Sequence, residues 1–181
     1  SGNLGNILSS YTPLFIKNYG LTGLSTISVR GTNASSNLFL WNNISLQNGM
    51  NGQLDLSTIP MFFIESVGIT YGGSSYSQNS SNIGGEFRLN NNLKIDGESN
   101  IIGEYRICSY SNYMYGIKLK YSNKKLSSRT KLFYKEGKNN FEYRNIAKYG
   151  FPIENLSNAE MIQKGIMQEN SFMINKNSRL N

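Results

Sequence analysis

The sequence predicts a mainly β fold, in which a small α+β unit is followed by antiparallel strands. Residues 1–91 contain short apolar segments separated by glycine, asparagine and serine, which is typical of a compact unit with many turns. Residues 92–181 contain longer segments in which apolar and polar side chains alternate, as they do in β-strands. The polar triplet Asn90-Asn91-Asn92 separates these two patterns. We therefore expect two parts, residues 1–91 and residues 92–181.

The distribution of charge supports the same division. Residues 1–90 carry equal numbers of basic and acidic side chains, so the whole formal net charge of +7 comes from the residues after Asn90. In that second part the lysines and arginines alternate with tyrosines. This alternation favours one polar face of a β-sheet over a groove for single-stranded nucleic acid, so we expect no nucleic-acid partner.

The first part is expected to contain several short elements. Asn3–Leu8 is predicted to form a helical turn. Thr26–Arg30 alternates apolar and polar residues like a half-buried strand, whereas Leu38–Trp41 is wholly apolar and suits a central strand. Leu14–Lys17 and Val67–Tyr71 are predicted to be further strands.

A helix is also predicted in the first part. Ser57 or Thr58 is suited to cap its beginning, because a hydroxyl oxygen accepts hydrogen bonds from unpaired backbone N–H groups. Pro60 then lies in the first turn, where its missing N–H has no cost. We expect this helix to run to about Ser66.

The second part is predicted to contain about five alternating strands, which are too few to close a barrel. Strands of roughly 9–11 residues with one apolar and one polar face are typical of outer-membrane barrels. The same pattern fits an antiparallel sheet on a soluble core, and alternation alone leaves both interpretations open. Phe133 interrupts the strict alternation. The predicted segments are Ile101–Ser109, Tyr113–Tyr121, Thr130–Lys135, Phe141–Arg144 and Met161–Asn175.

The composition excludes several kinds of chemistry. The chain has no histidine and one cysteine, Cys108, so it holds no disulfide framework, no Cys/His zinc cluster and no Ser-His or Cys-His catalytic pair. No spacing of carboxylates singles out an acid and a base, and no aspartate cluster suits calcium. The densest apolar run, Ile59–Ile64, is much shorter than a transmembrane helix. We expect no enzyme activity, no cofactor and no metal.

The order of the glycine-rich segments resembles the plug domain of a TonB-dependent outer-membrane receptor. The resemblance rests on Val29–Ser36, Leu38–Asn43, Leu54–Pro60, Tyr71–Ser75 and Ile83–Gly85, taken in that order. Arg30–Ser35 is most similar to the cobalamin-receptor branch. Trp41-Asn42-Asn43 stands where the family usually has Asp-Gly, and this variant resembles receptors of Bacteroidetes-type bacteria. Gly84-Gly85 lies where the family's plug leads to the first barrel strand.

The resemblance implies a plug domain at residues 1–91 and the first strands of a transmembrane β-barrel at residues 92–181. It implies a location in the outer membrane of a Gram-negative bacterium and active uptake of a scarce nutrient. Cobalamin or a related corrinoid is the leading candidate, followed by an iron-siderophore or an oligosaccharide. The implied partners are the small-molecule ligand, the remainder of the barrel, outer-membrane lipid and a TonB-type energy-coupling protein. The segment that contacts the coupling protein is expected before Ser1.

Two glycine-rich loops correspond to ligand-facing loops of cobalamin receptors. Glycine lets backbone groups approach a ligand closely, and the neighbouring side chains are uncharged hydrogen-bonding groups and one thioether. This chemistry suits a large neutral ligand, although both loops are equally consistent with simple turns. The expected ligand-binding residues are Tyr19, Gly20 and Thr22 in the first loop and Asn48, Gly49, Met50 and Asn51 in the second.

A second set of residues is expected to hold or gate the plug. Arg30 closes a strand in a part of the chain with no net charge, so we expect a specific carboxylate partner, either Glu65 or a residue of the barrel wall. The remaining members of this set are Gly31, Gly72, Gly73, Gly84 and Gly85.

The alternative interpretation is a small self-contained β protein, either an eight-stranded outer-membrane barrel or an adhesin-like surface protein. An eight-stranded barrel fits within 181 residues. The short elements of the first part argue against it, because such a barrel needs long alternating strands throughout.

Overall fold

The computed structural model describes residues 3–19, 23–72, 83–175 and 178–180. The chain divides into two compact units, Ser1–Asn92 and Leu93–Asn181. Within the described residues, no helix is long and apolar enough to cross a membrane.

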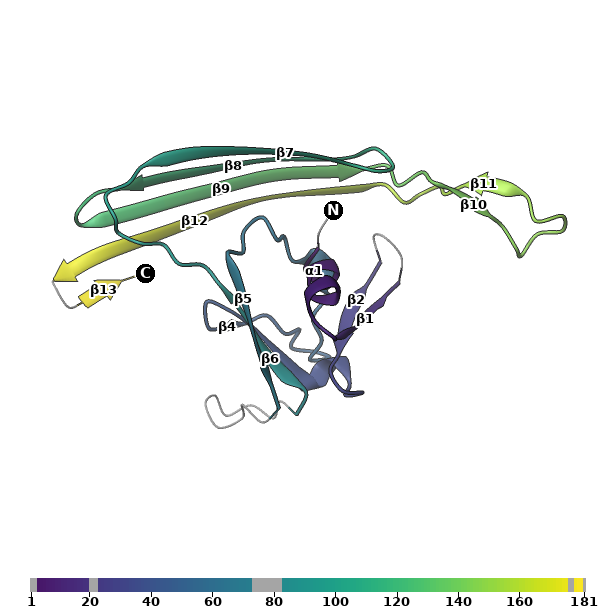
Figure 1. Cartoon of the computed structure of the whole chain (residues 1–181), viewed down its shortest axis with the longest axis horizontal. Helices are drawn as coiled ribbons and strands as arrows, with labels where there is room; N and C mark the ends of the chain where they lie inside the picture. Colours follow the sequence, from purple (N-terminus) through teal and green to yellow (C-terminus); the bar gives the residue numbers. More distant parts are fainter. Residues whose placement is uncertain (1–2, 20–22, 73–82, 176–177, 181) are drawn as a thin grey trace. The chain divides into compact units, whose positions relative to one another are not determined.

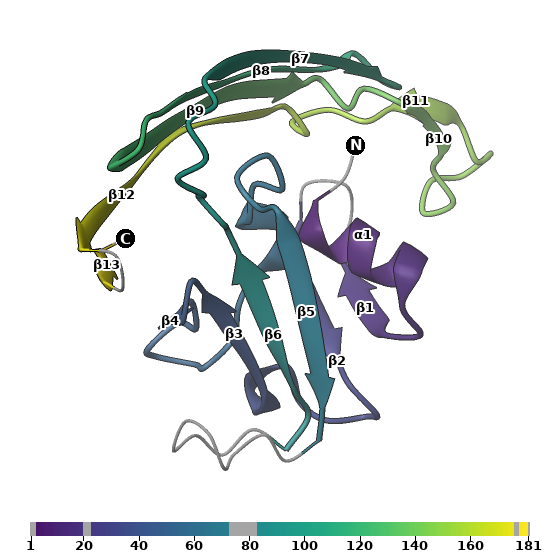
Figure 2. The same cartoon turned by 60° about the vertical axis from the view of Figure 1, so that its left-hand side comes forward.

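The described residues of the first unit form one α-helix and two small sheets (Figures 1 and 2). Helix α1 (Leu4–Tyr11) is followed by an antiparallel hairpin of β1 (Phe15–Asn18) and β2 (Ser25–Ser28). The second sheet has the order β4-β3-β6-β5. Strands β3 and β6 pair in parallel, and the other two pairs are antiparallel. Its strands are β3 (Asn37–Trp41), β4 (Ile44–Ser45), β5 (Ser66–Tyr71) and β6 (Gly85–Asn90).

The parallel pair β3–β6 forms the centre of the first unit's core. Phe39 lies opposite Phe87 in the register, and their rings stack with centroids 4.6 Å apart. Leu4 of α1, Val29 and Leu56 are completely or almost completely buried in the same cluster. The core therefore joins the helix, the hairpin and the larger sheet.

Several predicted elements of this unit are confirmed, but the alternation of β2 is not. The predicted strands at Leu38–Trp41 and Val67–Tyr71 correspond to β3 and β5. Strand β2 ends at Ser28, because Arg30 has a positive φ of 51° and the chain turns there. Ser25, Thr26 and Ile27 are all buried, so this strand is not half-buried.

The predicted helix from residue 57 to residue 66 is wrong. Only a single 3₁₀ turn, η2 (Leu56–Thr58), forms in this region, and its cap is Asp55 rather than Ser57 or Thr58. A turn follows, in which the Phe63 N–H donates to the Pro60 carbonyl at 3.0 Å. Phe62, Phe63 and Ile64 are all buried, and three consecutive buried side chains do not fit one face of a helix.

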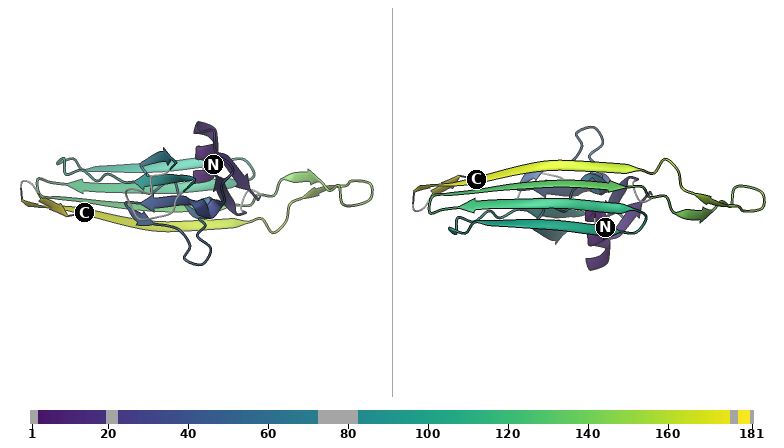
Figure 3. Two further views of the ribbon diagram at one scale, coloured as in Figure 1. Left: turned by 90° about the horizontal axis from the view of Figure 1, so that it is seen from below. Right: turned by 90° about the horizontal axis from the view of Figure 1, so that it is seen from above.

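The second unit contains a five-stranded antiparallel sheet, in which every strand except β13 is long (Figure 3). Its order is β13-β12-β9-β8-β7, so all five strands lie in the order in which they occur along the chain. The strands are β7 (Asn100–Cys108), β8 (Asn112–Ser122), β9 (Leu126–Gly137), β12 (Met161–Asn175) and β13 (Ser178–Leu180).

The two faces of this sheet have opposite chemistry. In β8 the exposed side chains are apolar or aromatic, namely Tyr115, Ile117, Leu119 and Tyr121. In β9 the charged Arg129 and Lys131 are buried instead. Apolar side chains outside and charged side chains inside are the reverse of a soluble sheet and are typical of a membrane-spanning wall.

Phe133, which interrupts the alternation, points to the same face as Arg129 and Lys131 and is 7 % exposed. Its register partners on both sides are glycines, Gly116 in β8 and Gly165 in β12. Because glycine has no side chain, Gly116 and Gly165 leave room for the Phe133 ring. The ring in turn covers the backbone of the two glycines.

The predicted strand Phe141–Arg144 does not continue the large sheet. Strand β10 (Glu142–Arg144) pairs only with β11 (Ile153–Asn155), and this hairpin extends beyond the ends of the long strands (Figure 1). Glu154 holds the hairpin together, because its carboxylate accepts from Asn145 Nδ2 at 2.9 Å and pairs with Lys148 Nζ at 2.6 Å. The sequence of β10 alternates like that of the long strands, but the hairpin lies in the connection between β9 and β12.

Truncation of the central ring should destabilise the first unit. Phe87→Ala removes the stack with Phe39 and leaves a cavity, so we expect the free energy of unfolding to fall by about 3–5 kcal/mol. Denaturation can be followed by the fluorescence of Trp41, the only tryptophan of the 181 residues. Phe15→Ala is the control, because Phe15 is 67 % exposed and its loss should be small. Equal losses in both variants would contradict this account of the core.

Acidification should loosen the β10–β11 hairpin. The hydrogen bond from Asn145 and the ion pair with Lys148 hold the pKa of Glu154 below its ordinary value of 4.5. Their contribution to stability is therefore complete above that value and is lost as the pH falls through the lowered pKa. A nitroxide label at Ala147→Cys, in a Cys108→Ser background, should become more mobile on going from pH 7 to below the ordinary carboxyl range. If the label in the Glu154→Gln variant showed the same dependence of mobility on pH, Glu154 would not be the group whose protonation loosens the hairpin.

Candidate ligand-binding site

The second predicted loop, residues 48–52, is a closed turn fastened to the start of β3. The Gly52 N–H donates to the Asn48 carbonyl at 2.8 Å. Gln47 Nε2 donates to the Asn37 carbonyl at 2.8 Å and to the Gly52 carbonyl at 3.0 Å. The loop is thus held at its base, and Met50 at its tip is 97 % exposed.

The two asparagines of this loop build the turn with their side-chain oxygens. Asn48 Oδ1 accepts from the Met50 N–H at 2.9 Å, and Asn51 Oδ1 accepts from the Gln53 N–H at 3.0 Å. Both residues and Gly49 are exposed. Since their oxygens are engaged in the turn, these side chains can offer a ligand their amide nitrogens as donors, beside the Met50 thioether.

The first predicted loop is closed at its base by Tyr19, whose N–H donates to the Leu24 carbonyl at 3.0 Å. The Tyr19 ring is exposed, and Lys17 Nζ lies 5.2 Å from its centroid. Gly23 fits only as glycine, because a Cβ there would lie 1.9 Å from the Tyr19 carbonyl oxygen. The predicted site residues Gly20 and Thr22 lie outside the described residues.

Asp55 links the segments that follow the two loops. Its Oδ1 accepts from the N–H of Ser25, which begins β2, at 3.0 Å and from the N–H of Ser57 at 2.9 Å. Asp55 is not among the site residues predicted from the sequence. The available signal was Asp followed two residues later by Ser, a pattern in which the carboxylate accepts from the backbone of a turn. One carboxylate thus fixes the stems of both candidate loops.

Arg30 does not form the predicted ion pair with Glu65 in the described part of the first unit. Its guanidinium carbon lies 5.9 Å from the centroid of the Tyr71 ring, which is a cation–π distance. Glu65 instead accepts from the Asn92 N–H at 2.8 Å. Arg30 and Gly31 both have positive φ angles, of 51° and 79°, so the chain reverses between β2 and β3. Tyr71 was missed because an aromatic partner leaves no charge signal.

The predicted glycines lie where β3, β5 and β6 begin or end. The Gly84 N–H donates to the Ser36 carbonyl at 3.1 Å. A Cβ on Gly84 would lie 2.3 Å from Asn37 Oδ1, so no side chain fits there. Gly72 has a positive φ of 77°, and Gly85 pairs with both Asn37 and Tyr71. Gly73 lies outside the described residues. These glycines shape the backbone of the first unit.

The charged face of the large sheet is internally paired. Glu169 of β12 lies 2.8 Å from Arg129 Nε and 3.6 Å from Lys131 Nζ. Lys120 Nζ lies 2.5 Å from Asp96 Oδ2. These pairs neutralise part of the positive charge of this face, which carries more basic than acidic side chains.

A hollow of about 290 Å³ lies in the first unit, where residues 61–66, α1 and β5 meet. Its lining is mostly apolar and includes Leu8, Met61 and Ile69. It is at the lower size limit of small-molecule pockets, roughly 300 Å³. Across the described ranges, no group of three or more histidine, cysteine, aspartate or glutamate residues is arranged to hold a metal ion.

Comparison with known proteins agrees with this geometry. Residues 1–86 match the family model described as the TonB-dependent receptor plug domain. Among solved structures, the chain is similar to the copper transporter OprC, with a TM-score of 0.70 and 12 % sequence identity. The likeness covers 97 % of this chain and 26 % of OprC, so the chain spans about a quarter of that protein's length. A search of curated proteins finds no match.

The two findings overlap in the first unit and agree with each other there. The family match covers the first unit, and the structural likeness extends over the second unit with its amphipathic strands. TonB-dependent receptors sit in the outer membrane of Gram-negative bacteria and are not enzymes. Residues 1–86 are therefore a TonB-dependent receptor plug domain, and the antiparallel strands that follow share the fold of the corresponding part of OprC.

Proposed function

We propose that this chain is the ligand-gating part of an outer-membrane receptor that takes up a scarce nutrient. The observation that carries the proposal is the direct connection of a plug domain to strands with one apolar and one charged face. A plug restricts passage through a wall of this kind, and transport then requires that the plug move. A TonB-type protein is the proposed source of the energy for that movement.

We infer that the ligand contacts the two loops whose stems Asp55 connects. Both loops expose uncharged groups, namely the Tyr19 ring, the amide nitrogens of Asn48 and Asn51, and the Met50 thioether. Such groups suit a large neutral ligand. Together with the motif Arg30–Ser35, they support cobalamin or a related corrinoid as the leading substrate, ahead of an iron-siderophore or an oligosaccharide.

Copper is a second candidate substrate. The similar structure is named as a copper transporter, and the exposed Met50 thioether is a soft ligand of the kind that Cu(I) prefers. A single thioether is too few ligands for a complete copper site. Copper therefore ranks below the corrinoid, unless residues elsewhere in the receptor contribute.

The role of the loops can be tested through Asp55 in the receptor that contains this chain. Asp55→Ala leaves the N–H groups of Ser25 and Ser57 unpaired and frees both stems, so we expect cyanocobalamin affinity to fall by about ten-fold. Asp55→Asn is the matched control, because its amide oxygen still accepts both hydrogen bonds. Equilibrium dialysis measures the affinity. Equal affinity in Asp55→Ala and the parent would show that the loops are not the binding site.

The choice between corrinoid and copper can be tested at Met50. Met50→Leu keeps the apolar volume of the exposed tip but removes the sulfur atom. A corrinoid receptor should keep its cyanocobalamin affinity within about two-fold, since a single exposed contact is worth little. A copper receptor should lose Cu(I) retention, measured by competition with a colorimetric chelator. Loss of Cu(I) retention in Met50→Leu with no cyanocobalamin binding in the parent would replace the corrinoid proposal.

A further inference from the structure

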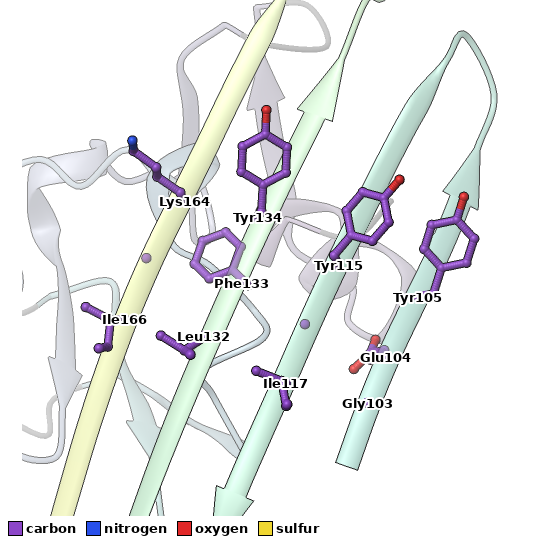
Figure 4. A pocket seen from close by; sticks show the side chains of 12 residues that line it. Gly103, Glu104, Tyr105, Tyr115, Ile117, Leu132, Phe133, Tyr134, Lys164 and Ile166 are labelled. Carbon is purple, nitrogen blue, oxygen red and sulfur yellow. The ribbon is translucent and has the colours of Figure 1, made fainter. Parts of the chain in front are cut away.

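The apolar face of the large sheet carries a groove with a volume of about 900 Å³ (Figure 4). One wall is a row of three tyrosines, Tyr105, Tyr115 and Tyr134, which lie side by side on β7, β8 and β9. The Tyr105 and Tyr115 rings are 4.9 Å apart. The same row ends on β12 with Lys164, the register partner of Tyr134.

The opposite wall is aliphatic and lies two residues away from the first row on each strand, on the side of the β8–β9 turn. It consists of Ile117, Leu132 and Ile166, with Gly103 at the β7 end. A Cβ on Gly103 would meet no atom within 4 Å, so the groove is open there. The residues between the two walls point to the other face, as Phe133 does, which leaves main chain as the floor of the groove.

Lys164 is the exposed cation of this groove and has no ion-pair partner among the described residues. The nearby Tyr134 hydroxyl donates to Glu136 at 3.0 Å. Further along the same face of β9 and β12, polar side chains satisfy one another, as Ser128 Oγ and Asn170 Oδ1 do at 2.9 Å. A cation left without such a partner on an apolar face indicates an anion that the chain itself does not supply.

The level of the groove in the membrane follows from the lengths of the connections. One end of the sheet holds only the three-residue turn 123–125 between β8 and β9. The other end holds the three-residue turn 109–111 between β7 and β8 and the long connection 138–160 between β9 and β12, which includes the β10–β11 hairpin. In outer-membrane barrels the short turns are periplasmic and the long loops extracellular. Lys164 lies three residues from the loop end of β12 and so belongs to the outer leaflet.

We propose that this groove binds a phosphate-bearing lipid of the outer leaflet. One acyl chain lies along the floor between the tyrosine wall and the aliphatic wall, and the lipid phosphate contacts Lys164 Nζ. The three tyrosine hydroxyls lie at the level of the headgroup, where aromatic residues of membrane proteins gather. The groove faces away from the charged side of the wall, so the inference does not depend on which nutrient is transported.

The contribution of Lys164 to lipid selection can be given a size. A lysine at an anionic membrane surface favours binding by about five-fold. The acyl chain supplies affinity that is common to charged and zwitterionic lipids, because it comes from apolar contact alone. Lys164 should therefore determine which headgroup is preferred, and the apolar walls of the groove should determine how strongly a lipid with either headgroup is retained.

The test uses the whole receptor, purified and delipidated in detergent, and native mass spectrometry of the lipids that it retains. With phosphatidic acid and phosphatidylcholine of identical acyl chains, the parent should retain phosphatidic acid about five-fold better. Lys164→Gln should abolish this preference, and Lys164→Arg should keep it. Lys124→Gln is the matched control, because Lys124 is exposed in the short turn at the other end of the sheet.

A second variant tests the groove separately from the charge. Gly103→Leu places a side chain in the open end of the groove, where its Cβ meets nothing, and should reduce retention of both lipids. Gel electrophoresis serves as the folding control. If the loss of lipid is specific, the Gly103→Leu variant should keep the heat-resistant migration of the parent. The proposal is overturned if the parent shows no preference, if Lys164→Gln keeps it, or if millimolar inorganic phosphate displaces the lipid, since that would indicate a free-anion site.

Discussion

The parallel pairing of β3 with β6, fixed by the stacked rings of Phe39 and Phe87, is the constraint on which the first unit depends. Parallel neighbours cannot be joined by a tight hairpin, so the chain between them has to return along the sheet. That return path contains β4, the 48–52 loop, η2 and β5. The exposed loop around Met50 therefore exists because a parallel pair needs a long connection, and Asp55 fixes this connection to the start of β2.

Patterns of side-chain polarity predicted the strands of the first unit better than its irregular parts. The wholly apolar Leu38–Trp41 run is a buried strand as expected, because a strand covered on both faces buries successive residues. The same burial of Phe62 and Phe63 occurs in turns, and nothing in composition distinguishes the two cases. Arg30 was assigned a carboxylate partner from charge alone, whereas its contact with Tyr71 depends on the meeting of two strand ends.

In the second unit, period-two alternation predicted the long strands, because both faces of the sheet impose strict and opposite requirements. Strand β10 alternates in the same way but lies in a connection, since three residues are too few for the pattern to carry information. Of the candidate site, the sequence identified the exposed loop residues. It did not identify Asp55 or the groove at Lys164, because both depend on residues far apart in the chain that the register brings together.

Strand β7 has a hydrogen-bonded partner on one side only within the described residues, namely β8. In a bilayer the bare N–H and C=O groups on its other side are too costly to leave unpaired, and only a closed barrel removes such an edge. The strand that would pair with this edge is not among the described residues. Closure of the sheet would therefore pair the β7 edge and complete its backbone hydrogen bonds in one step.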